Sequence, residues 1–260
     1  MTDAETPKRS ALPPPPLRDR LAARRAGLSR RQGRIRRLPE PRFFGSVARG
    51  AELVAGSFLV EGSLVEAPDT SPWEITPPDA AFAAALHGFG WLEDLAALGG
   101  SRAQGRARDW TLGWIARFGH GRGPGWRPAL AGRRLRAWIG HGQFLSPRDP
   151  ADAERIATAL LRHATYLFRR WRAAPAGRDR LDALAGLAAA GLVLEDGERF
   201  LAPALEGIAD ICTREIDPEG GIAARNPEAL MEMFATLVWI ADLLREAGRR
   251  SGPALPDAIL

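Results

Sequence analysis

Residues 79–98 read DAAFAAALHGFGWLEDLAAL, and this stretch decides the expected fold class. Its large apolar side chains recur every three or four residues, at Phe82, Leu86, Phe89, Leu92 and Leu95. That spacing places them on one face of an α-helix. The pair Gly99-Gly100 follows as a helix stop signal. The sequence therefore predicts an amphipathic helix over residues 79–98.

The helical pattern continues towards the C-terminal end. It predicts six more helices, over residues 102–118, 128–144, 152–171, 178–194, 197–216 and 227–249. Short connections rich in Gly and Pro separate them, and short loops make successive helices antiparallel. No fixed-period repeat is present, which argues against a tetratricopeptide or ankyrin array. The expected fold is all-α, an array or ring of helical hairpins over residues 77–260.

The segment before the helices differs in charge and composition. Residues 1–37 hold eleven basic and three acidic side chains, a net of +8, while the other 223 residues carry a net of −3. The run Pro13–Pro16 is too stiff for a helix, and a helix over 17–37 would have sparse apolar positions. The sequence predicts a disordered basic arm over 1–37, open to RNA or anionic lipid as alternatives. An irregular lead-in follows over 38–76, with two short β-prone runs within 52–62.

Scarce residue types exclude several kinds of chemistry. Lys8 is the only lysine, so the body has no P-loop and no Schiff-base lysine. Cys212 is the only cysteine, and the four histidines form no HExxH motif. We therefore expect no metal and no other cofactor.

Targeting signals are also missing from the sequence. No apolar run of about 18 residues is present, and no apolar segment follows the basic arm as in a secretory signal. We therefore expect a cytoplasmic protein without a membrane partner, with a periplasmic location left open.

Four pairs of residues are candidates for a functional site. His87 and Trp91 are four apart, and Trp138 and His141 three apart, which puts each pair on one helix face where it can bind a substrate. His163 and Tyr166 are three apart and can exchange a proton with a substrate. Arg225 and Asn226 open the last helix, where an anionic group can bind. For each pair a structural role is the alternative: core packing for the first three, and helix capping for Asn226.

Three segments together resemble one protein family. They read LHGFGWLEDLAALGG from Leu86, WRPALAGRRLRAWIGHGQFL from Trp126, and EIDPEGGIAARNPEALMEMFATLVWIADLL from Glu215. Their order and spacing are similar to the N-terminal region of the bacterial heparinase II/III-like proteins, from about Arg42 to Pro256. The resemblance implies an incomplete (α/α) toroid of helical hairpins. It also implies a β-sandwich partner, as a separate domain or chain.

The resemblance further implies a carbon-oxygen lyase that cleaves acidic polysaccharides by β-elimination. Tyr166 or His163 would then be the base, Arg225 would offset the substrate carboxylate, and Asn226 would complete the catalytic set. His87, Trp91, Trp138 and His141 would bind the glycan.

The chain departs from the family pattern in three places. Ala229 and Leu230 stand where active lyases carry Tyr-His, and 178–180 read Arg-Asp-Arg where Asn-His is expected. The chain also ends at Leu260, about where the β-sandwich would begin. Two other functions therefore stay open: a non-catalytic module that binds glycan or protein, and nucleic-acid binding through the arm, the less favoured of the two.

Overall fold

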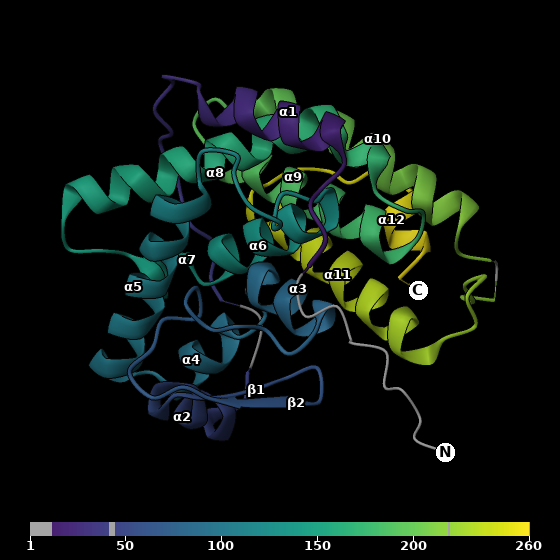
Figure 1. The fold of residues 1–260 in the computed structure, drawn as a ribbon. Coiled ribbons are helices and arrows are strands. Elements are labelled where there is room, and N and C mark those ends of the chain that lie inside the picture. The colour runs from purple at the N-terminus through teal and green to yellow at the C-terminus, as the bar shows by residue number, and fades with distance from the viewer. Residues whose placement is uncertain (1–11, 42–44, 218, 260) are drawn as a thin grey trace, which may run out of the picture.

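The computed structural model describes residues 12–41, 45–217 and 219–259 (Figure 1). Helices account for most of this part of the chain, and one two-stranded sheet accompanies them. The all-α prediction is thus confirmed. The elements are α1 (Leu17–Gly27), α2 (Val47–Ala55), β1 (Ser57–Val60), β2 (Ser63–Glu66), α3 (Ala80–Gly88), α4 (Leu92–Leu98), α5 (Gly100–Phe118), α6 (Pro128–Gly140), α7 (Gly142–Leu145), α8 (Pro150–Arg170), η1 (Trp171–Ala173), α9 (Arg178–Val193), α10 (Glu198–Arg214), α11 (Pro227–Glu246) and α12 (Ala254–Asp257).

Helix α9 forms the centre of the fold. Every residue from Leu181 to Gly191 is buried, and α6, α8, α10 and α11 all pack against this helix. Most of these residues are alanine, glycine or leucine, whose small or flexible side chains suit a helix that is covered on all sides. The most extensive contact joins α9 to α6, two helices that do not follow each other along the chain. The incomplete (α/α) toroid of antiparallel hairpins stays a prediction.

Two glycines allow α6 and α9 to approach closely. A Cβ atom on Gly186 would lie 2.6 Å from the Gly132 carbonyl oxygen, and one on Gly132 would overlap the Asp182 carbonyl. Both obstacles are main-chain atoms of a packed helix, so they cannot rotate away. The glycines therefore fix the distance between the two helices.

We expect Gly186→Ala to lower the free energy of unfolding by about 1 to 3 kcal/mol, because the added methyl group forces the helices apart. Gly105→Ala, on α5, is the matched control, since a Cβ there meets no heavy atom within 4 Å. That change should leave stability equal or slightly higher, because alanine favours the helix. Urea denaturation measures the stability of both variants. Equal stabilities would contradict the close approach of α6 and α9 at Gly186.

The structure corrects two of the predicted helices. The helix over 79–98 is broken into α3 and α4 at Phe89, whose φ is +65°, in the left-handed region. The apolar spacing hides this break because Phe89 is still buried, against Trp73, Trp91 and Trp138. The helix over 128–144 likewise ends at Gly140, and α7 follows after His141.

The lead-in contains a helix that the sequence did not predict. Residues 47–55 form α2, which begins where the Ser46 side chain accepts a hydrogen bond from the Arg49 N–H and ends at Gly56 with φ +94°. The β-prone pattern is realised later, in β1 and β2, which pair antiparallel. Glu61 and Gly62 join the strands with φ values of +49° and +76°, as a type I′ turn requires.

The expected disordered arm is also corrected, over residues 12–37; residues 1–11 lie outside the described residues. Helix α1 lies along α8 at the top of the molecule (Figure 1). Its buried residues are small, apart from Asp19, which forms an ion pair of 2.6 Å with Arg170 of α8. The chain then hydrogen-bonds the end of α9, from the Arg36 N–H to the Val193 oxygen at 2.8 Å. The small inner face of α1 and this buried ion pair hold the segment on the body.

Candidate functional site

The proposed bases, His163 and Tyr166, lie in the core, and neither side chain is exposed. The Tyr166 hydroxyl donates to the Trp126 carbonyl oxygen at 2.9 Å, and burial raises its pKa. His163 Nδ1 lies 2.7 Å from the Ala159 carbonyl oxygen, so Nδ1 carries the proton. A polysaccharide has no access to either side chain in this arrangement.

A buried guanidinium joins two of the predicted residues. Arg134 is fully buried, and its Nε donates to His163 Nε2 at 2.9 Å. Its Nη1 donates to the His87 carbonyl oxygen at 2.6 Å, and Nη2 to that of Gly125 at 3.2 Å. The guanidinium carbon also lies 3.9 Å from the centre of the Trp114 ring. Within the described chain no carboxylate pairs with Arg134, so carbonyls, an imidazole and an aromatic face stabilise this charge.

Burial keeps the residues around Arg134 neutral. The pKa of His87 falls to about 3, first through burial and then through Arg134 and Arg117. The pKa of His163 is also lowered, mainly by burial, with Arg134 adding to the effect. His87 Nδ1 accepts from Trp114 Nε1 at 3.0 Å, which requires the unprotonated nitrogen. The cluster is thus a structural centre of the core, and no sequence motif had indicated Arg134.

The other predicted residues lie in three different places. Trp138 packs in the core between Phe89, Trp114 and His163. Arg225 and Asn226 are exposed at the start of α11, where Asn226 Oδ1 accepts from the N–H groups of Glu228 and Ala229. The predicted cap at Asn226 is therefore present. Trp91 and His141 line a cleft, so the eight residues do not form one site.

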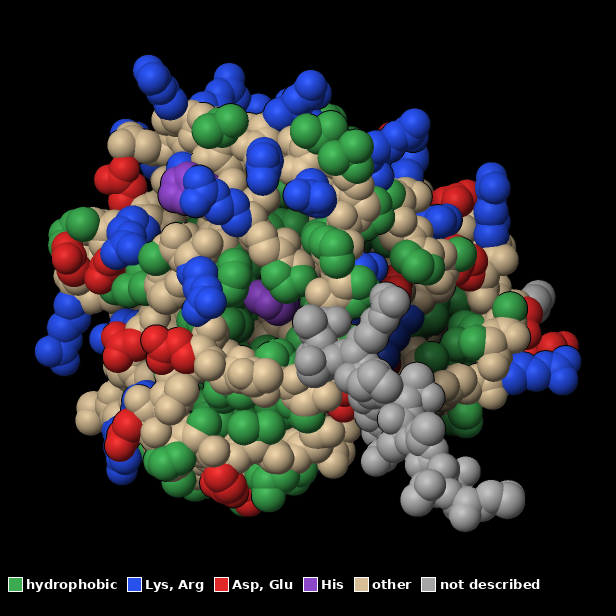
Figure 2. Space-filling model, in the orientation of Figure 1, with side chains coloured by type: hydrophobic (Ala, Val, Ile, Leu, Met, Phe, Trp, Pro, Cys, Tyr) green, Lys and Arg blue, Asp and Glu red, His purple; other side chains and the backbone are tan. Residues whose placement is uncertain are grey.

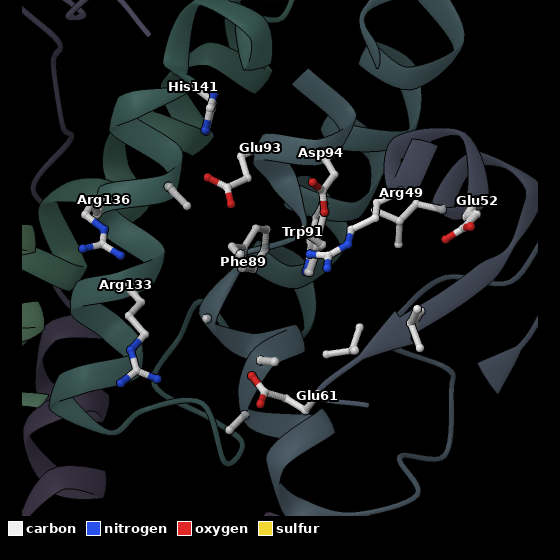
Figure 3. A pocket seen from close by; sticks show the side chains of 18 of the residues that line it. Arg49, Glu52, Glu61, Phe89, Trp91, Glu93, Asp94, Arg133, Arg136 and His141 are labelled. Carbon is white, nitrogen blue, oxygen red and sulfur yellow. The ribbon is translucent and has the colours of Figure 1, made fainter. Parts of the chain in front are cut away.

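That cleft is a cavity of about 410 Å³ between two walls (Figure 3). One wall consists of α2, β1 and α4, with Arg49, Glu52, Glu93 and Asp94. The other consists of α6, with Arg178 at the start of α9 and Glu232 in the second turn of α11. Between them, the turn from α3 to α4 forms the floor, at residues 88–91. Burial lowers the pKa of His141, at the edge of this floor, to about 4.

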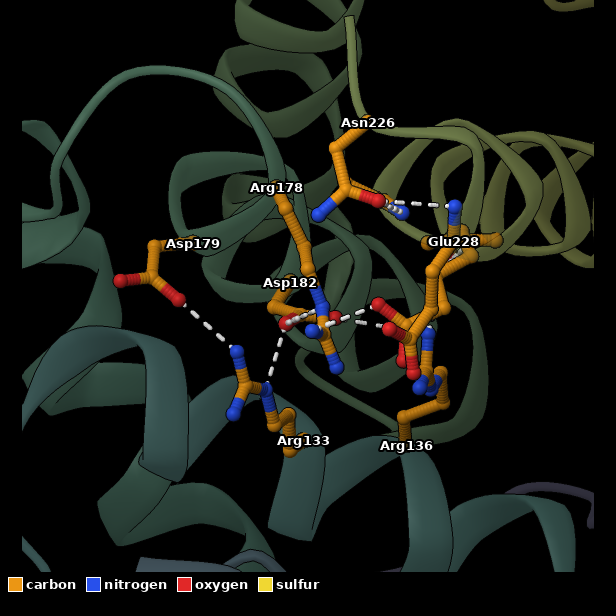
Figure 4. A network of polar contacts seen from close by, with 10 residues as sticks. Arg133, Arg136, Arg178, Asp179, Asp182, Asn226 and Glu228 are labelled. Carbon is orange, nitrogen blue, oxygen red and sulfur yellow. Dashed lines mark hydrogen bonds and ion pairs between the residues drawn. The ribbon is translucent and has the colours of Figure 1, made fainter. Parts of the chain in front are cut away.

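The second wall is held by a network of ion pairs around Asp182 (Figure 4). Its carboxylate is almost fully buried and lies 2.6 Å from Arg133 Nε and 3.4 Å from Arg136 Nη1. Arg133 also pairs with Asp179 at 2.8 Å, and Arg178 with Glu232 of α11 at 2.6 Å. These pairs join α6 to α9 and α9 to α11 across about 50 residues of sequence, so no local pattern could reveal them.

A second surface feature is the outward face of α1. Leu17, Leu21 and Leu28 are 49–78% exposed, and their spacing puts them within a stripe about 40° wide on a helix. Arg18, Arg20, Arg24 and Arg25 flank this stripe and are all exposed. Asp19, the only acidic residue between 12 and 37, is buried against Arg170. Figure 2 shows basic side chains gathered along this upper side of the molecule, with apolar side chains between them.

The described residues contain neither a candidate metal site nor a candidate membrane span. Among residues 12–41, 45–217 and 219–259, no three His, Cys, Asp or Glu side chains are grouped so that they could hold a metal ion. In the same ranges, no helix is both long enough and apolar enough to cross a bilayer.

Comparisons with known proteins identify a similar protein by name but neither a family model nor a solved structure. No family model matches the chain, and no solved structure matches it. FtsZ-localized protein C of Caulobacter vibrioides (strain NA1000 / CB15N) is 31% identical over 215 residues. The match covers 82% of this chain and 37% of that protein, so the chain spans well under half the length of its relative.

This relative overturns the expected function. The lyase prediction was wrong, because FtsZ-localized protein C, which is similar to most of this chain, is not a polysaccharide lyase. The catalytic and glycan-binding roles of the eight residues were predicted for the lyase reaction, so they have no support once that reaction is set aside. The resemblance to heparinase II/III-like proteins in the helical region is not tested by this match and stays a prediction.

Proposed function

We propose that this protein is a binding module that acts where FtsZ is located and that attaches to an anionic membrane surface through α1. The similarity to FtsZ-localized protein C supports the first part and agrees with a cytoplasmic location. The exposed leucines and arginines on the outward face of α1 support the second part, attachment to an anionic membrane surface. It replaces our expectation of no membrane partner, since the absence of a spanning helix does not bear on surface binding.

The composition of α1 favours a lipid surface over other partners. Large leucines point outward while Ala23, Ala26 and Gly27 point inward, the reverse of an ordinary surface helix. An apolar stripe between arginines is typical of helices that lie in the membrane interface, where the leucines enter the acyl region and the arginines meet lipid phosphates. Nucleic acid would use the arginines but would leave the leucines without a role.

Vesicle flotation tests this proposal. The protein should bind vesicles that contain phosphatidylglycerol and bind pure phosphatidylcholine only weakly, because each arginine near an anionic surface contributes about 1 kcal/mol. The variant Leu17→Ser/Leu21→Ser/Leu28→Ser should bind about a hundredfold more weakly, since each leucine loses about 1 kcal/mol of transfer free energy.

Leu59→Ser/Leu64→Ser is the matched control, because these two leucines are also about half exposed but lie on the hairpin. It should bind like the wild type. Unchanged binding by the α1 variant would refute attachment through α1. Tight binding of a DNA duplex that depends on the arginines and not on the leucines would favour nucleic acid. Co-sedimentation with FtsZ polymers tests separately whether the protein acts where FtsZ is located. If the wild-type protein did not co-sediment, this part of the proposal would lose its support.

A further inference from the structure

Two glycines, Gly88 and Gly90, lie in the floor of the cleft between α4 and α6. Neither the packing nor the backbone conformation of the fold requires glycine at these positions. A Cβ atom on Gly90 would meet no heavy atom within 4 Å, and one on Gly88 would meet only side-chain atoms of Arg133 and Leu130, at 3.8 to 3.9 Å, an ordinary van der Waals contact. Neither glycine has a positive φ, whereas Phe89 between them does. The effect of the two glycines is to leave the main chain of the floor accessible to whatever enters the cleft.

The two walls of the cleft differ in whether their charged side chains have partners. The arginines on the wall formed by α6 and α9 are already paired, Arg133 with Asp179 and Asp182, and Arg178 with Glu232. On the opposite wall Glu93 is half-buried, and no described residue forms a hydrogen bond or an ion pair with its carboxylate. Figure 3 shows this carboxylate directed into the cavity, with Arg136 on the far side.

The neighbours of Glu93 leave an excess of negative charge. Asp94 follows Glu93 directly, and the Asp94 carboxylate accepts a hydrogen bond from the Ser46 N–H at 2.7 Å. Glu52 and Glu61 line the same side of the cleft and are exposed, and Arg49 is the arginine that lines the cleft on this side. Burial raises the pKa of Glu93, and the repulsion from Asp94 raises it further, although Arg136 and Arg49 act in the opposite direction. A cation placed beside Glu93 would relieve both effects.

We infer that this cleft binds an extended segment of a partner protein that carries a lysine or arginine, with its cationic group paired to Glu93. The segment's main chain lies over Gly88 and Gly90, where no side chain keeps it away. The cleft is formed by residues other than those of α1, so this site is additional to the membrane attachment proposed above.

Fluorescence anisotropy with three labelled peptides tests the inference. The peptides are identical except for a central arginine, glutamine or glutamate between leucines. We expect the arginine peptide to bind about tenfold more tightly than the glutamine peptide, as one charge-assisted pair predicts, and the glutamate peptide to bind least. Glu93→Gln should remove the preference for arginine while leaving the glutamine peptide unaffected.

Gly90→Val should weaken all three peptides at least tenfold, because its side chain occupies the floor of the cleft. Gly105→Val is the matched control, since Gly105 lies in equally open space but on α5, away from the cleft. The α1 variant should bind the arginine peptide like the wild type, which separates this result from the vesicle experiment. No binding by any peptide, equal binding of the arginine and glutamate peptides, or an unchanged affinity of Gly90→Val would each overturn the inference.

Discussion

Replacing Arg134 with alanine is expected to lower the free energy of unfolding by about 4 kcal/mol, as estimated from three buried acceptors that each lose their donor. The acceptors are His163 Nε2 and the carbonyl oxygens of His87 and Gly125. The Trp114 ring would also lose the cation packed on its face. Chemical denaturation monitored by tryptophan fluorescence measures the change.

Arg106→Ala provides the control for this experiment. Arg106 pairs with Asp69 at 2.7 Å on the surface, where the Asp69 side chain is almost fully exposed. Such pairs contribute about 0 to 1 kcal/mol because water screens them. If Arg134→Ala cost no more than Arg106→Ala, the buried guanidinium would not be the structural centre that its contacts indicate.

Acidification is expected to lower the free energy of unfolding by roughly 5 kcal/mol between pH 7 and pH 5, from three histidines that protonate only when the chain unfolds. His87 and His141 have pKa values lowered to about 3 and about 4, and that of His163 is also well below its ordinary value. Below pH 6.5 the unfolded chain therefore binds protons that the folded chain does not. Stability is complete above pH 6.5 and falls as the pH falls. Glu93 and Glu232, whose pKa values burial raises, oppose this trend in part.

One substitution isolates a single histidine in that pH dependence. His87→Asn keeps an acceptor near the position of Nδ1 for the Trp114 N–H but cannot be protonated. The slope of stability against pH near pH 5 should fall by about 1.4 kcal/mol per pH unit, the equivalent of one proton. An unchanged slope would mean that His87 does not contribute to the acid sensitivity.

Patterns within one helix predicted much of the fold. The helix over 178–194 was expected and is α9, and the Asn-Pro pair at 226–227 was expected to cap a helix and does so. Local propensity is sufficient in these cases because the signal and its consequence lie within one turn. The break at Phe89 escaped the same reasoning, since a buried aromatic side chain compensates a strained backbone that only the tertiary structure reveals.

The sites were less accessible from sequence. The pairs of Arg133 with Asp182 and of Arg178 with Glu232 bring together residues about 50 positions apart, so no spacing rule could suggest them. The signal for α1 was present: Leu17, Leu21 and Leu28 share one helix face. These sparse apolar positions instead led to the prediction of a disordered arm, because sequence alone does not show which face of a helix is covered. The structure corrects this prediction, since small residues cover the inner face of α1 and the leucines point outward.

The most direct test of the account places a polarity-sensitive dye on the outward face of α1. The dye is attached at Leu21→Cys in a Cys212→Ala background, because Cys212 is the only native cysteine. Addition of vesicles containing phosphatidylglycerol should shift the emission to the blue and increase its intensity, as the dye enters the acyl region. The same dye at Leu64→Cys, on the hairpin, should not respond. An unchanged spectrum at Leu21→Cys, or an equal shift at both positions, would contradict membrane attachment through α1.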